Sequence, residues 1–135
     1  MGKYTESALG YRKVQPHHNC AQSVACAFCE LMGLDHDEAM RLTLQYGGGK
    51  KLTCGAVMGA RAVINYMTGM KNEEDAAYNN EKNAALFEKL HAEFIAMNKS
   101  DLCKEIKANG YRSCDGCVED AATILEKMIE NGEIK

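Results

Sequence analysis

Seven cysteines are the residues of this sequence best suited to chemistry, and four of them stand where helices are expected to begin. These four are Cys20, Cys54, Cys103 and Cys114. A thiolate at a helix start is stabilised by the helix dipole and by the N–H groups that lack a partner in the first turn. Because helix ends can converge in a bundle, these thiols predict one shared site. There they would either form reversible disulfides or hold a metal ion or cluster.

Cys54 has the most favourable surroundings for a reactive thiol. It follows the stretch GGGKKLT and precedes the small residues of GAVMGA. The glycine run offers bare backbone N–H groups, and Lys50 and Lys51 add positive charge. Both features favour a thiolate over a thiol. We therefore expect Cys54 to be the activated thiolate, with one of the other three thiols as its resolving partner.

The helix expected after Cys54 has a face of small residues, namely Gly55, Ala56 and Gly59. Such a face lets a second backbone or a cofactor approach closely, so helix packing and cofactor binding both remain open. The run GGGKK lacks the GxxxxGK[S/T] spacing of a phosphate-binding loop, which argues against a nucleotide site.

Two CxxC pairs differ in their settings. Cys26 and Cys29 fall inside a predicted helix, where we interpret them as packing residues. Cys114 and Cys117 enclose Asp-Gly at a helix start, a setting that lowers the pKa of a thiol. A zinc site built from two CxxC pairs would need a matched second pair, and the first pair is a doubtful partner.

The four histidines carry weaker signals than the cysteines. His17 and His18 precede Cys20 and could supply a ligand or a proton beside a thiol, although connector histidines are more often solvated. We expect His36 to be solvated at a helix start and His91 to lie at the boundary of the core.

The elements that would position these residues are all helical. Apolar periodicity and capping signals predict helices over residues 3–10, 20–32, 36–46, 54–67, 74–98 and 115–130, with a short turn near 102–107. Asn19, Asp35 and Thr53 are expected N-caps, and Gly33 and Gly69 expected stops. No stretch alternates with period two. The prediction is an all-α bundle of about five or six helices in a single domain, residues 1–135.

Composition excludes several classes of protein. The net charge is −3, and basic residues are scattered among acidic ones, so no nucleic-acid partner is expected. The opening residues contain no apolar run of a secretory signal, and the most apolar stretch, residues 54–70, contains Arg61 and Asn65. We therefore expect a cytoplasmic protein without a membrane span, in which seven cysteines indicate metal binding or redox activity more than a disulfide framework.

Four segments together resemble the family of redox-active proteins named for its C_GCAxxG_C_C cysteine pattern. They are NCAQSVACAFCELMGL, TCGAVMGA, SDLCKEI and SCDGCVEDAATILEKM, and in this order they span residues from about 19 to 130. The resemblance implies that the four family cysteines are Cys20, Cys54, Cys103 and Cys114, with Cys117 as the alternative for the last. Cys26, Cys29 and Cys117 are additional to the family set, and their role stays open.

The resemblance implies an all-helical redox or metal-binding protein. We expect an oxidoreductase or electron-transfer protein, and an exposed redox centre in so small a chain favours a protein redox partner. The resemblance leaves two hypotheses open on the same four cysteines. In the first they perform thiol–disulfide exchange or electron transfer. In the second they form a metal-binding module that holds zinc or a [2Fe–2S] iron–sulfur cluster, the latter proposed for a similar cysteine arrangement in a domain attached to a multihaem cytochrome. Gly55, Ala56 and Gly59 would then give the cofactor room. A homodimer is also left open.

Overall fold

Helices make up nearly all the regular structure of this chain. The computed structural model describes residues 2–49 and 52–134, and within them it contains eight α-helices, two 3₁₀ helices and no strand. The elements are α1 Lys3–Tyr11, α2 Cys20–Ala27, α3 Cys29–Met32, α4 His36–Thr43, η1 Leu44–Gly49, α5 Gly55–Met67, η2 Glu81–Asn83, α6 Ala84–Asn98, α7 Cys103–Asn109 and α8 Cys114–Glu130. The all-α prediction is confirmed, while the expected count of five or six helices is too low.

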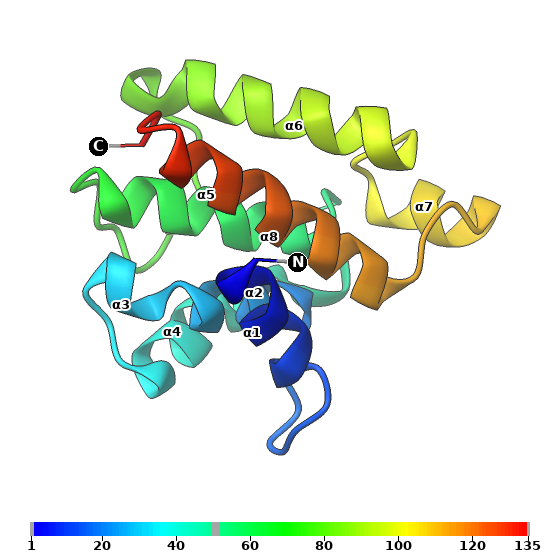
Figure 1. Cartoon of the computed structure of the whole chain (residues 1–135), viewed down its shortest axis with the longest axis horizontal. Helices are drawn as coiled ribbons and strands as arrows, with labels where there is room; N and C mark the ends of the chain where they lie inside the picture. The colour runs from blue at the N-terminus through cyan, green and yellow to red at the C-terminus, as the bar shows by residue number, and fades with distance from the viewer. Residues whose placement is uncertain (1, 50–51, 135) are drawn as a thin grey trace.

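Helix α5 runs through the middle of the molecule, with α6 and α8 on one side and α2 on another (Figure 1). Every residue from Gly55 to Tyr66 is buried except Arg61, as expected for a helix that is apolar around its whole circumference. Gly59 explains how close α2 approaches. A Cβ atom there would lie 2.7 Å from the carbonyl oxygen of Ala21 and 3.0 Å from its Cα. Only glycine admits the α2 backbone at this distance.

Local capping sets where α2 and α4 begin, as the sequence predicts. The Asn19 side chain accepts a hydrogen bond from the Gln22 N–H, and the Gln22 side chain accepts one from the Asn19 N–H. Asp35 and Glu38 form the same reciprocal capping box before α4. The helix expected over 20–32 is divided at Phe28, which is fully buried and stacks on Tyr4 with ring centroids 4.7 Å apart.

The long helix expected over 74–98 is shorter, since α6 begins only at Ala84. The reason lies in Asn65 of α5, which is fully buried. Its side-chain NH₂ donates to the carbonyl oxygens of Ala76 and Tyr78 at 2.9 and 3.1 Å. Its side-chain oxygen accepts from Asn80 and Asn83 at 2.7 and 2.9 Å. These bonds hold the segment before α6 in a turn, so tertiary contacts override the local helix propensity.

The remaining expectations are met in part. Phe87, Leu90 and Phe94 of α6 are buried as predicted, but Met97 of the same stripe is 51% exposed. Gly33 ends α3 in the left-handed conformation, with φ of 78°. Among the described residues, none of the helices is both long and apolar enough to cross a bilayer.

Candidate functional site: a cysteine pocket

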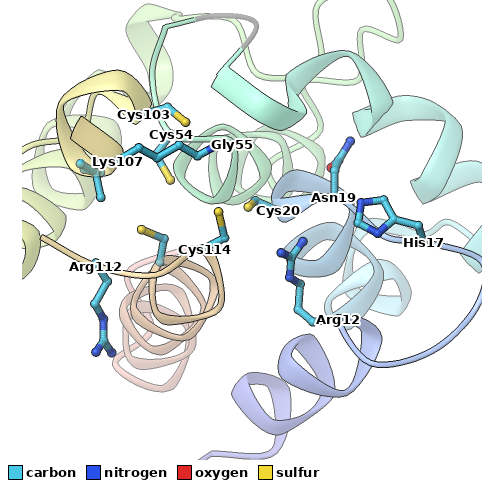
Figure 2. A pocket seen from close by; sticks show the side chains of 12 residues that line it. Arg12, His17, Asn19, Cys20, Cys54, Gly55, Cys103, Lys107, Arg112 and Cys114 are labelled. Atoms are coloured by element: carbon cyan, nitrogen blue, oxygen red, sulfur yellow. The ribbon is translucent and has the colours of Figure 1, made fainter. Parts of the chain in front are cut away.

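The four cysteines selected from the sequence surround one cavity of about 190 Å³ (Figure 2). Cys20, Cys103 and Cys114 are the first residues of α2, α7 and α8, and Cys54 is the N-cap of α5. Four helix starts therefore meet at this point. We call the cavity the cysteine pocket, and its lining residues are Arg12, His17, Asn19, Cys20, Cys54, Gly55, Cys103, Ile106, Lys107, Arg112, Cys114 and Cys117.

A pair of backbone hydrogen bonds holds Cys54 beside Cys103. The Cys54 N–H donates to the Asp101 carbonyl at 2.7 Å, and the Cys103 N–H donates to the Leu52 carbonyl at 3.0 Å. Thr53 and Leu102 form an isolated antiparallel bridge between the same two segments. Thr53 was expected to cap α5, but Cys54 occupies that position and makes no side-chain capping bond. The bridge thus aligns the starts of α5 and α7.

Helix α8 contributes two thiols to the cysteine pocket, one turn apart. Its first turn is capped by Ser113, whose hydroxyl accepts from the Gly116 N–H at 3.0 Å. Cys114 lies near enough to Cys20 to raise the pKa of that thiol, and Cys117 has the same effect on Cys54. Cys20 and Cys114, the outer pair, are partly exposed, whereas Cys54 and Cys117, the inner pair, are buried. The pocket therefore contains two thiol pairs at different depths.

The surroundings of Cys54 act against a thiolate. The neighbouring Cys117 thiol raises the pKa of the Cys54 thiol most, followed by burial. The N–H groups of Ala56 and Val57 at the start of α5 lower this pKa, but they do not outweigh the first two causes. The N–H groups at the helix start therefore act as expected, but the pKa of Cys54 is raised and not lowered as predicted. Lys50 and Lys51, the predicted source of positive charge, lie outside the described residues.

At Cys20 and Cys103, two partly exposed thiols with a cation nearby, burial again raises the pKa more than the cation lowers it. Burial, and then the neighbouring Cys114, raise the pKa of Cys20 to about 12, although the Arg12 guanidinium lowers it. Burial also raises the pKa of Cys103, against the lowering effect of Lys107. In the protonated, metal-free state these thiols hold their protons more tightly than a free cysteine does.

Three cationic side chains line the cysteine pocket, namely Arg12, Lys107 and Arg112. Arg12 is fixed in place because it donates to Asp115 and to the His18 carbonyl, both at 2.9 Å. Arg112 donates to Asp120 at 3.1 Å. The cysteine pocket thus combines sulfur with positive charge, a combination suited to a thiolate, a cluster of thiolates or an anionic partner.

The small residues of α5 do not all face the cysteine pocket; some of them pack against α2. Gly55 lines the cysteine pocket, where an added Cβ would lie 2.9 Å from the Tyr46 carbonyl and 3.3 Å from the Cys20 Cβ. Ala56 is fully buried, and Gly59 faces Ala21 of α2. Neither Ala56 nor Gly59 is among the described residues that line the pocket. Close backbone approach is therefore what this face provides at Gly59.

Several lining residues were missed or undervalued by sequence reasoning. Cys117 carried a usable signal, since the CDGC motif stands at a helix start, but its pairing with Cys54 was not foreseen. His17 lines the pocket as one of the two histidines before Cys20. Arg12 and Arg112 belong to no motif, and only the folded chain brings them to the sulfur atoms.

The sulfur positions bear on which metal would fit. Tetrahedral zinc with Zn–S bonds of about 2.3 Å requires four sulfur atoms roughly 3.8 Å apart. Within residues 2–49 and 52–134, no three of the pocket cysteines have sulfur atoms all within 4.8 Å of one another. Zinc bound by four of these thiols would therefore require the sulfur atoms to come closer together. A [2Fe–2S] cluster needs two thiolates on each of two irons, which matches two separate thiol pairs.

Comparison with known proteins found a family model that matches most of the chain. A family model described as "Putative redox-active protein (C_GCAxxG_C_C)" matches residues 18–128, a range that includes all seven cysteines. No curated protein and no solved structure matches the chain. Because the family match covers well over half of the sequence, the chain belongs to the C_GCAxxG_C_C family, which is described as redox-active.

Proposed function

We propose that this protein is a dithiol reductant that transfers electrons from the cysteine pocket to a protein partner. The observation that carries the proposal is the pairing of thiols within one cavity, Cys20 with Cys114 and Cys54 with Cys117. Neighbouring thiols can close a disulfide when their Cβ atoms come within about 3.5–4.5 Å of each other. The family description as redox-active supports the same reading.

The outer pair is the proposed point of exchange because Cys20 and Cys114 are partly exposed. One of these thiols loses its proton and attacks a disulfide of the partner, which forms a mixed disulfide and releases one partner thiolate. The second thiol then loses its proton and attacks the mixed disulfide, which closes Cys20–Cys114 and frees the other partner sulfur. The two protons released from the pocket protonate the two partner thiolates. Two electrons pass to the partner.

The buried inner pair would act as a second store of two electrons. Cys103 is proposed to connect the pairs, because its own thiol is partly exposed and its pKa responds to both Cys54 and Cys114. Exchange through Cys103 would pass a disulfide from the outer pair to Cys54 and Cys117 without an external reagent.

The direction of transfer follows from the raised thiol pKa values. A dithiol is a strong oxidant in its disulfide form when its reduced state is stabilised as a thiolate. Here burial raises the pKa of Cys20 to about 12, and the neighbouring Cys117 thiol together with burial raises the pKa of Cys54. The reduced state lacks that stabilisation, so the disulfides are expected to have a low potential and the dithiols to donate electrons. Lys107 adds positive charge beside the cysteine pocket, while Arg12 and Arg112 are each paired with an acidic side chain, Asp115 and Asp120.

Disulfide mapping tests the proposal directly. Reduced protein, freed of metal, is oxidised mildly with diamide and digested, and the cross-linked peptides are identified by mass spectrometry. We expect bonds Cys20–Cys114 and Cys54–Cys117, and loss of the first bond in Cys114→Ser. Cys29→Ser is the matched control because Cys29 is half-buried but does not line the pocket. It should keep both bonds, and an oxidised protein without either bond would reject the proposal.

A [2Fe–2S] cluster is the second candidate, favoured by the same two thiol pairs. Cys20, Cys54, Cys114 and Cys117 would hold it, and it would supply one-electron transfer. The native mass of anaerobically purified protein distinguishes the candidates, because only the cluster adds the mass of two irons and two sulfides. In the cluster case Cys117→Ser should lose the added mass and Cys103→Ser should keep it.

A further inference from the structure

A second group of metal-ligating side chains lies outside the cysteine pocket. It consists of His18 in the connector before α2, Cys26 in the last turn of α2, and His36 at the start of α4. One donor atom from each lies within 4.8 Å of the other two, and among the described residues no other group of three or more meets this criterion. None of the three lines the cysteine pocket.

The two imidazoles face each other through the same ring atom. Nε2 of His18 and Nε2 of His36 are 2.9 Å apart. The Tyr11 ring packs against both, with centroids 4.9 Å from His18 and 5.5 Å from His36. Cys26 turns its thiol toward the same place, since its Sγ lies 3.9 Å from the His36 carbonyl oxygen. Three elements that are separate in sequence thus direct two nitrogens and one sulfur to one point.

The outer atoms of the two rings favour Nε2 as the ligating atom. Nδ1 of His36 lies 3.3 Å from the Asp37 carboxylate, which orients the ring and leaves Nε2 on the inner side. A carboxylate behind a ligating histidine is a common feature of zinc sites. His18 is only 2% exposed, and its Nδ1 is buried without a hydrogen-bond partner. Burial also lowers the pKa of His18.

We propose that His18, Cys26 and His36 bind a zinc ion through Nε2, Sγ and Nε2, in a site independent of the cysteine pocket. Two imidazoles and one thiolate are borderline ligands that suit zinc, and a water completes the tetrahedron. That fourth position opens toward solvent beside His36, whose side chain is 36% exposed, whereas His18 and Cys26 are buried. The Cys26 proton leaves to solvent when the ion binds, because the ligand is the thiolate.

The spacing needs little adjustment. Zn–N bonds of about 2.0–2.1 Å in a tetrahedron place two nitrogens roughly 3.3 Å apart. The imidazoles would therefore separate by about 0.4 Å from their present 2.9 Å, and the thiol would approach from within 4.8 Å. Side-chain rotations accommodate changes of this size without moving a helix.

The proposed ion has a structural consequence for the cysteine pocket. It would fasten the connector that contains His18 to α2 and to α4. Arg12, at the other end of this connector, donates to the His18 carbonyl at 2.9 Å and lines the cysteine pocket. Zinc at His18 would therefore hold Arg12 near Cys20, although the zinc ligands and the residues lining the cysteine pocket are different residues.

Zinc stoichiometry in variants tests the site. The background is Cys54→Ser/Cys114→Ser, in which each thiol pair of the cysteine pocket is broken. Reduced, metal-free protein is titrated with zinc and weighed by native mass spectrometry. We expect one bound zinc in this background, and loss of that ion when Cys26→Ser or His36→Ala is added. His17→Ala is the matched control, as the exposed neighbour of His18, and should retain the ion.

A measurement on the unmodified protein avoids any folding defect of the variants. The protein contains four histidines, which are resolved by NMR when labelled with ¹³C. Zinc is expected to shift the ring signals of His18 and His36, while the signal of His91 stays in place. The proposal is overturned if the ring signals of His18 and His36 do not respond to zinc, or if Cys26→Ser binds zinc as tightly as His17→Ala.

Discussion

Replacement of Gly59 by alanine adds one methyl group at the closest contact between α2 and α5. The new Cβ would lie 2.7 Å from the Ala21 carbonyl oxygen and 3.0 Å from its Cα. Both are backbone atoms, so α2 must shift as a unit. Overpacking of this kind costs typically about 1–3 kcal/mol. Alanine recovers about 1 kcal/mol through its higher helix propensity. We therefore expect Gly59→Ala to lower the free energy of unfolding by up to roughly 2 kcal/mol.

The assay is urea unfolding of reduced protein followed by circular dichroism, with Gly10→Ala as the matched control. Gly10 is also helical, in α1, but an added Cβ there meets nothing within 4 Å. Gly10→Ala should therefore raise the stability by about 0.5–1 kcal/mol. In Gly59→Ala the shift of α2 should also reduce the yield of the Cys20–Cys114 disulfide. The packing argument is refuted if Gly59→Ala is at least as stable as the unmodified protein.

Two further predictions concern the hydrogen-bond network and the thiols. Asn65→Ala leaves two carbonyls and two side-chain amides without their partner, so urea unfolding should show a loss of about 2–4 kcal/mol. Asn79→Ala, at an exposed position of the same segment, should change stability by less than about 0.5 kcal/mol, and equal effects of the two would contradict this account. The pKa of Cys20 is about 12 in the folded protein, above its ordinary value of 9.0, so the unfolded chain loses this proton first. The contribution of the Cys20 proton to the free energy of unfolding of reduced, metal-free protein should be complete below about pH 9 and should decline as pH rises toward 12. Cys20→Ser should therefore show a smaller decline when urea unfolding is measured between about pH 8 and 10.

Features that depend on neighbouring residues in the chain were predictable. The capping boxes at Asn19 and Asp35 are formed within one helical turn, and the stop at Gly33 needs only its own left-handed conformation. The helix starts at Cys20 and Cys114 follow from the capping side chains of Asn19 and Ser113, whereas α7 begins at Cys103 without a side-chain cap. By contrast, the segment 74–83 has helical composition but is held in a turn by Asn65, which a local pattern does not reveal.

Sequence alone determined an all-helical chain whose cysteines stand at helix starts, because helix formation and capping are short-range. Tertiary structure decided which thiols meet, since Cys54 pairs with Cys117 across two helices. It also reversed the expected pKa of Cys54, because burial and a second thiol outweigh the N–H groups at the start of α5. Tertiary structure also creates the group of His18, Cys26 and His36. These residues come from three separate segments, which converge only after α2 and α4 pack together.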